Sequence, residues 1–125
     1  MDLKGKCIIN SNFNMDKIAE LYIEMYVFAD EVGEIENGKF IEQKNVMCYI
    51  ACIYTMGGAV KNNKLVLDLI LKQIDTMFPT EVKDELKAAV NSCKDNIKKY
   101  KDICEASYYM AKCTYDAAPD AFLFP

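Results

Sequence analysis

Apolar side chains recur every three or four positions along most of the chain, which is the spacing of helices that bury one face. In the first such stretch, Asn14 can serve as the N-cap and Gly33 can end the helix. Its apolar positions are Ile18, Leu21, Tyr22, Met25, Ala29 and Val32. The pattern predicts a first helix that ends at Gly33, followed by a connection over residues 33–41.

The same spacing predicts a second helix over about residues 43–56 and a third over about residues 65–77. The Gly57-Gly58 pair weakens the end of the second helix, and Asn62-Asn63 marks a turn. The expected inward positions of these two helices are Met47, Ile50 or Ala51, Tyr54, Leu65, Leu69, Ile70 and Ile74.

Two more helices complete the pattern. Pro79 ends the third helix, and Thr80 can cap the fourth. The fourth helix has one apolar stripe, formed by Val82, Leu86, Ala89, Val90, Cys93 and Ile97. The fifth, over about residues 102–115, has its inward positions at Ile103, Ala106, Met110 and Cys113. No segment alternates apolar and polar residues as a half-buried strand does, so the fold class is all-α.

The C-terminal segment is unusually apolar. After Pro119 come Ala121, Phe122, Leu123, Phe124 and Pro125. Burying each large apolar side chain is worth about 1.5–3 kcal/mol, so we expect this tail to fold back onto the helices. The alternatives are an ordinary apolar terminus and a tail that makes crystal or dimer contacts.

Length and charge narrow the class of protein. A chain of 125 residues, 52% of them hydrophobic, corresponds to one domain over residues 1–125. The formal net charge of −4 argues against nucleic acid and against an anionic membrane surface as partners. No apolar run approaches the roughly 18 residues of a membrane span.

The chain contains no histidine. Its absence excludes Cys/His zinc sites, Ser-His-Asp and Cys-His nucleophiles, and histidine acid–base catalysis. The 19 Asp and Glu residues are typical of solvated helix faces, and no pair stands inside an apolar stretch. We therefore expect no enzyme activity, catalytic residue, metal site or cofactor, and a hydrolase with paired carboxylates is the weakest alternative.

Six cysteines, an even number, are typical of a secreted chain that pairs them. Cys48 and Cys52 lie on one face of a helix, so each more naturally bonds a different element. Cys104 and Cys113 face roughly opposite sides of the last helix and should also reach different elements. Spacing alone leaves several pairings open, and a zinc cluster or redox switch is the alternative. No signal peptide is visible, so we expect the mature form of a secreted protein.

The cysteine spacing and four short segments resemble the six-cysteine insect odorant-binding proteins. Between successive cysteines lie 40, 3, 40, 10 and 8 residues. The segments are MCYIAC at 47–52, KQIDTMFP at 72–79, CEASYYMAKC at 104–113 and the closing APDAFLFP. The resemblance is strong over residues 43–125.

This resemblance implies a compact bundle of about five to six helices around one apolar cavity. The disulfides that it implies are Cys7–Cys52, Cys48–Cys104 and Cys93–Cys113. It implies an extracellular carrier for a small hydrophobic ligand such as an odorant or pheromone, in sensillar lymph or another secretory fluid. An odorant receptor is a further candidate partner, and the carrier is expected to be a monomer or weak homodimer.

The N-terminal part departs from the family's pattern. Only six residues precede Cys7, where such proteins usually carry a helix. The interval from Cys7 to Cys48 is long, and we interpret it as the family's next helix prolonged by about a dozen residues through Val32. The longer helix substitutes for the missing one, or one end of the cavity is open or covered by a second chain. The alternative function is a salivary, venom or reproductive-fluid scavenger or protein-binding module on the same fold.

Candidate ligand contacts come from the inward helix faces and the tail, where a mostly apolar pocket with a few polar groups is expected. They are Tyr54, Met56, Ala59, Leu69, Met77, Leu86, Ala89, Val90, Tyr108, Ala111, Thr114, Phe122 and Phe124. For each of them, ordinary core packing is the competing interpretation. The seven methionines suit a pocket that adapts to several ligands, or fill gaps in an ordinary core.

Polar groups bear on ligand choice and release. Alcohol-binding members of the family carry a serine and a threonine where this chain has Tyr54 and Ala59, so short alcohols are not expected ligands. Tyr54 or Tyr108 could offer a phenolic hydroxyl to a longer ligand. Without histidine, acid-triggered release would need buried carboxylates such as Asp116, Asp120 or the chain terminus. We therefore expect weak pH dependence of binding above about pH 5.

Overall fold

The structure, a computed structural model, describes Cys7 and residues 32–122. Its elements in chain order are the 3-10 helix η1 (Ile35–Asn37), α3 (Lys44–Met56), β1 (Val60–Lys61), β2 (Lys64–Leu65), α4 (Leu67–Met77), α5 (Thr80–Ser92), α6 (Asp95–Lys99) and α7 (Ile103–Ala117). The predicted all-α class is confirmed, because helices form almost all of the regular structure in these residues. Except for its last residue, Val32, which is helical and buried, the predicted first helix lies outside the described residues.

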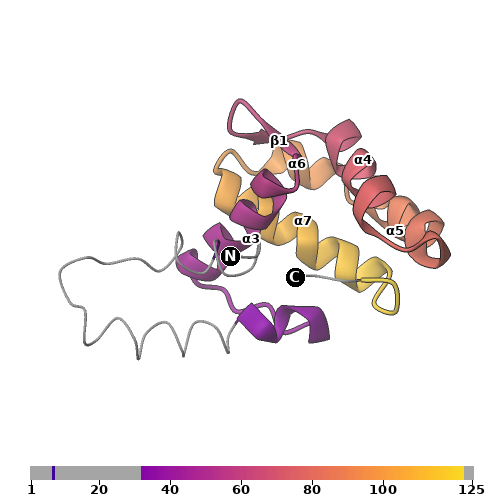
Figure 1. The fold of residues 1–125 in the computed structure, drawn as a ribbon. Helices are drawn as coiled ribbons and strands as arrows, with labels where there is room; N and C mark the ends of the chain where they lie inside the picture. The colour runs from indigo at the N-terminus through magenta and orange to yellow at the C-terminus, as the bar shows by residue number, and fades with distance from the viewer. Residues whose placement is uncertain (1–6, 8–31, 123–125) are drawn as a thin grey trace.

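Helix α7 is the centre of the structure and packs against α3, α5 and α6 (Figure 1). Against α3 it buries Tyr108 and Ala111 beside Tyr49 and Ile50, all almost completely removed from solvent. A second cluster joins Met110 of α7 to the apolar side chains of α4 and α5. Because α7 contributes to both clusters, it fixes the position of α3 relative to the α4–α5 pair.

Helices α4 and α5 form an antiparallel pair to one side of α7 (Figure 1). Pro79 separates them, as predicted, and its ring cannot continue α4. Ile70 and Ile74 of α4 share a hydrophobic cluster with Leu86 and Val90 of α5. Lys87 and Asp75 also form an ion pair between the two helices.

A short antiparallel hairpin corrects the prediction that the chain has no strand. Val60 pairs with Leu65, and Lys61 pairs with Lys64. The predicted Asn62-Asn63 turn is confirmed, with φ angles of 54° and 60° that suit the left-handed positions of a tight hairpin. Strands of two residues are too short to show an alternating pattern, and Leu65, predicted to start the third helix, belongs to β2 instead.

Two helix boundaries also differ from the prediction. Thr80 does not cap α5 but is its first helical residue, and Pro79 occupies the N-cap position. The predicted fourth helix is interrupted at Cys93, so Ile97 lies on the separate helix α6. The break falls at Cys93 and Lys94, and Asp95 is the first residue of α6.

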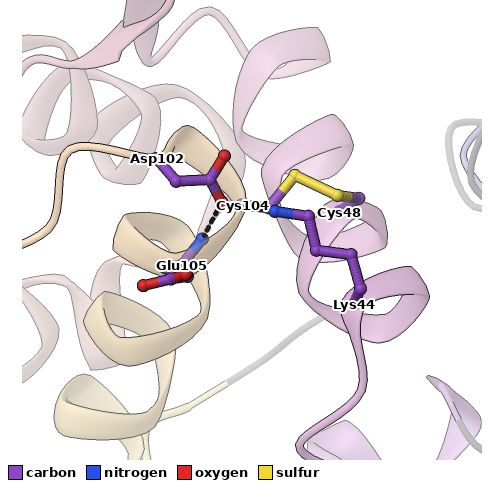
Figure 2. Close-up of polar contacts among 5 residues, drawn as sticks. All are labelled: Lys44, Cys48, Asp102, Cys104 and Glu105. Carbon is purple, nitrogen blue, oxygen red and sulfur yellow. Dashed lines mark hydrogen bonds and ion pairs between the residues drawn. A yellow bond between two sulfur atoms is a disulfide. The ribbon is translucent and has the colours of Figure 1, made fainter.

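The start of α7 is held by charged and covalent contacts to α3 (Figure 2). Asp102 is the N-cap: its Oδ2 accepts a hydrogen bond of 3.0 Å from the Glu105 N–H and lies 2.7 Å from Lys44 Nζ. These bonds, with the Lys44 hydrogen bond first among the causes, lower the pKa of the Asp102 carboxyl. The Cys48–Cys104 disulfide joins the same two helices beside this pair.

The three disulfides are Cys7–Cys52, Cys48–Cys104 and Cys93–Cys113, as the family resemblance implied. The first ties Cys7 to α3, the second ties α3 to α7, and the third ties the end of α5 to α7. No bridge joins two cysteines of one helix, which agrees with the helical-face argument.

Residues 33–41, predicted as a connection, contain the 3-10 helix η1, whose first residue is buried. Ile35 is completely buried in the cluster between α3 and α7. Gly38 follows η1 with a φ of 86°, and its N–H donates to the Ile35 carbonyl. The Tyr108 hydroxyl donates to the Phe40 carbonyl over 2.8 Å, which holds this segment against α7.

The C-terminal tail folds back as predicted, as far as the structure describes it. The N–H groups of Ala121 and Phe122 donate to the Ala118 carbonyl, and both side chains are buried. The Phe122 ring lies edge-on to the rings of Phe40 and Tyr115. The remaining residues, Leu123, Phe124 and Pro125, lie outside the described residues.

Candidate functional site

A cavity of about 300 Å³ lies between the α4–α5 pair and helices α3 and α7, with residues of η1 and the tail in its wall. Helix α4 contributes Ile70, Ile74 and Met77, which fall on one face because they are four and three positions apart. Leu86 and Val90 of α5 follow the same rule. The remaining lining residues are Glu36, Ile53, Tyr54, Gln73, Phe78, Thr114 and Phe122. The wall is therefore mostly apolar, with few polar groups.

The structure brings together about half of the predicted ligand contacts. Those that line the cavity are Tyr54, Met77, Leu86, Val90, Thr114 and Phe122. Phe124 lies outside the described residues. The others, found elsewhere in the structure, are Met56, Ala59, Leu69, Ala89, Tyr108 and Ala111.

These six residues outside the cavity have different environments. Met56, at the end of α3, is 45% exposed. Ala59 directly precedes β1, and its carbonyl accepts from the Val66 N–H, while Leu69 is half-buried on α4. Ala89 packs with two alanines of the tail. Tyr108 and Ala111 belong to the hydrophobic core between α3 and α7, because α7 buries two of its faces.

Sequence reasoning missed six lining residues, which are Glu36, Ile53, Ile70, Gln73, Ile74 and Phe78. Ile70 and Ile74 carried a signal, because the helical period had already marked them as inward. Gln73 lies between them on the same turn, but its polar side chain gave no reason to place it there. Glu36 comes from the segment interpreted as a connection.

The polar groups of the cavity differ in their hydrogen bonding and burial. Thr114 Oγ1 donates to the Met110 carbonyl over 2.8 Å within α7. Burial raises the pKa of the Tyr54 phenol well above its usual value of 10, so this group stays protonated at physiological pH. Gln73 Oε1 is buried and has no hydrogen-bond partner in the described structure.

Tyr108 was predicted, as an alternative to Tyr54, to offer its hydroxyl to a ligand. This hydroxyl instead donates a hydrogen bond to the Phe40 carbonyl. Its neighbour Tyr109 donates to Glu42 Oε1 over 2.6 Å, and this hydrogen bond raises the pKa of Tyr109 to about 12. Both phenols therefore attach residues 40–42 to α7 rather than face the cavity.

A second hollow, of about 540 Å³, lies at the hairpin and α6. Its wall includes three lysines, Lys64, Lys98 and Lys101, all exposed, together with Leu65 and Ile97. An uncharged apolar ligand gains little beside ammonium groups, which must keep their water. The cavity bounded by α4 and α5 is therefore the better site for such a ligand.

The described residues provide neither a metal-binding cluster nor a free thiol. Among them, no group of three or more His, Cys, Asp or Glu side chains is placed to hold a metal ion. All six cysteines are in disulfides, so none provides a thiol. None of the helices in this part of the chain is long and apolar enough to span a membrane.

Comparison with solved structures supports the observed fold. Odorant binding protein 4 of Chrysopa pallens superposes with a TM-score of 0.73 and 24% identity, covering 98% of this chain and 89% of that protein. Odorant binding protein 5 of Apis mellifera superposes with a TM-score of 0.73 and 23% identity, covering 98% and 88%. At these identities the similarity concerns the fold alone.

Sequence comparison identifies relatives at higher identity. General odorant-binding protein 72 of Anopheles gambiae is 35% identical over 98 residues, which is 78% of this chain and 80% of that protein. General odorant-binding protein 19a of Drosophila melanogaster is 34% identical over 101 residues, 79% of this chain and 68% of that one. The model of the PBP/GOBP family matches residues 4–117. The chain therefore belongs to the PBP/GOBP family of insect odorant-binding proteins.

Proposed function

We propose that the protein is an extracellular carrier that binds a small hydrophobic molecule, an odorant or pheromone, in the cavity between α4, α5 and α7. The observation that carries the proposal is this cavity of about 300 Å³, lined mainly by apolar side chains. It lies at the lower end of the volumes typical of ligand sites, so the proposed ligand is small. Membership of the family supports the carrier role.

The disulfides suit such a carrier. A ligand cavity leaves part of the core unfilled, which lowers the packing energy available to the fold. Cys93–Cys113 attaches α5, which provides Leu86 and Val90, to α7. This bridge compensates for contacts that the cavity removes, and its oxidised state fits an extracellular location such as sensillar lymph.

The proposed ligand contacts are the predicted residues that line the cavity, together with Ile70, Gln73 and Ile74. An odorant receptor is the proposed further partner, and a monomer or weak homodimer the proposed assembly. Transport requires no chemistry on the ligand, so the proposal assigns no catalytic role to any residue.

The experiment is displacement of a hydrophobic fluorescent probe from the oxidised protein by a panel of alcohols, esters, aldehydes, fatty acids and amines. Val90→Phe and Leu86→Phe place extra volume in the cavity and should weaken probe binding by about ten-fold, which corresponds to 1.4 kcal/mol. Met56→Phe, an exposed position outside the cavity, is the matched control and should leave the affinity unchanged. Equal weakening in all three variants, or no probe binding to the folded protein, would contradict the proposal.

A further inference from the structure

Gln73 is the unusual residue of the cavity wall. It lies on α4 between Ile70 and Ile74, both of them buried and both part of the same wall. Its Oε1 atom is buried, and no described group donates a hydrogen bond to it. A buried acceptor without a partner is energetically unfavourable, and such groups in native structures call for an explanation.

Gly57 provides the space for this amide. A Cβ atom at residue 57 would lie 2.6 Å from Gln73 Cδ, closer than van der Waals contact allows. The backbone of Gly57 has a φ of −77°, which any L-residue can adopt, so its conformation does not require glycine. The absent side chain at the end of α3 therefore lets the Gln73 amide lie inside the wall.

Thr114 and Glu36, two other polar residues of the cavity wall, are less suited to select a ligand by hydrogen bonding. The Thr114 hydroxyl already donates within α7. The Glu36 side chain is exposed, so water competes for its carboxylate. An acceptor in low-dielectric surroundings discriminates more strongly, because a ligand that fails to pair with it leaves it unsatisfied.

We propose that the ligand carries one neutral hydrogen-bond donor, an alcohol or phenol hydroxyl, and that its apolar skeleton fills the rest of the cavity. Gln73 Oε1 has almost no accessible surface in this structure, so the amide at the flexible end of this side chain turns toward the ligand and accepts from the hydroxyl. A neutral hydroxyl suits this position better than an ammonium group, because the amide offers no charge to balance a buried cation. This inference rests on the proposed carrier function, and it names the ligand class of the same cavity.

The test compares three compounds with equal numbers of non-hydrogen atoms: 1-decanol, decanal and methyl nonyl ether. All three can accept a hydrogen bond, but of the three only the alcohol can donate one. Their affinities are measured by displacement of N-phenyl-1-naphthylamine from the oxidised protein. Gln73→Met keeps the length of the side chain and removes the amide oxygen, leaving a weakly accepting thioether.

The decisive quantity is the change in the alcohol-to-ether affinity ratio between the original protein and Gln73→Met, because this comparison cancels differences in ligand hydrophobicity. We expect the ratio to fall by about ten-fold, as the loss of one buried hydrogen bond would cause. The alcohol-to-aldehyde ratio should fall with it. Gln43→Met, the same replacement at an exposed position of the α3 N-cap, should leave both ratios unchanged.

The outcomes separate the two proposals. If the alcohol-to-ether ratio is equal in the original protein and in Gln73→Met, or falls equally in Gln43→Met, the role of Gln73 is refuted while the carrier function stands. If the aldehyde loses as much affinity as the alcohol, the amide donates rather than accepts, and the proposed ligand class is wrong. If the folded protein does not bind the probe, the carrier function fails first. Gln73→Leu repeats the test should Gln73→Met not fold.

Discussion

The side-chain amide of Gln73, in the middle of α4, occupies the space that any side chain at Gly57, at the end of α3, would need. The two residues belong to different helices, and the hairpin β1–β2 lies between them in sequence. A position without a side chain thus determines how a polar group is held in the wall of an apolar cavity.

Gly57→Ala should change ligand selectivity more than it changes stability. The added methyl group displaces the Gln73 amide, the flexible end of a long side chain, so the alcohol-to-ether ratio should fall toward that of Gln73→Met. The free energy of unfolding should change by no more than about 1 kcal/mol, because residue 57 has an ordinary φ. Probe displacement and urea unfolding measure the two effects.

Gly33→Ala is the control for this prediction, because a Cβ there would meet no described atom within 4 Å. It should leave the affinity ratio unchanged. An equal change in Gly33→Ala and Gly57→Ala would show that the effect of Gly57→Ala does not act through Gln73.

Gly38→Ala should be strongly destabilising, and Gly58→Ala provides its matched comparison. Both glycines have left-handed φ angles, 86° and 87°, so both substitutions meet a backbone strain of about 1–2 kcal/mol. A Cβ at residue 38 would also lie 2.5 Å from the Tyr115 ring, whereas one at residue 58 meets no described atom within 4 Å. Thermal unfolding should give a lower Tm for Gly38→Ala, and equal Tm values would refute the role of the Tyr115 contact.

Asp102→Asn should reduce stability at neutral pH and have little effect in acid. Lys44 and the Glu105 N–H lower the pKa of Asp102 in the folded state, so the stabilisation is present above the unfolded pKa of about 3.9 and is lost as pH falls through the lower folded value. Asparagine also caps helices well, so the substitution mainly removes the charge. The Asp102 side chain is 40% exposed, and solvent screening keeps the effect below about 1 kcal/mol.

Urea unfolding of both proteins at pH 7 and pH 3 measures this change. The stability difference between them should shrink at the lower pH. A difference that stays constant, or grows in acid, would mean that the charge of Asp102 does not contribute to folding in this way.

Compared with Cys48–Cys104, the Cys93–Cys113 bridge should contribute less to stability and more to ligand binding. It closes 20 residues, against 56 for Cys48–Cys104, so loop entropy assigns the two bridges about 3 and about 4 kcal/mol. Only the shorter bridge joins α5 to α7, two walls of the cavity. We therefore expect its replacement by two alanines to lower Tm less but weaken probe binding more than replacement of Cys48–Cys104; the reverse order would refute this role.

The helical period alone marked as inward several of the residues that line the cavity. Ile70, Ile74, Leu86 and Val90 recur at intervals of four, and a helix must turn such residues to one side. The apolar tail was likewise sufficient to predict that Phe122 would be buried, because exposure of an aromatic ring to water is unfavourable. These features depend on local geometry and on hydrophobicity, which are properties of the sequence itself.

Tertiary packing decided which inward residues face empty space. Ala111 and Thr114 both lie inward on α7. Ala111 packs into the hydrophobic core with α3, whereas Thr114 lines the cavity. Period marks the inward face of a helix, but the distance to the next helix determines whether that face is packed. The partnerless oxygen of Gln73 could not be predicted either, because it depends on Gly57 and on neighbours brought together only by the fold.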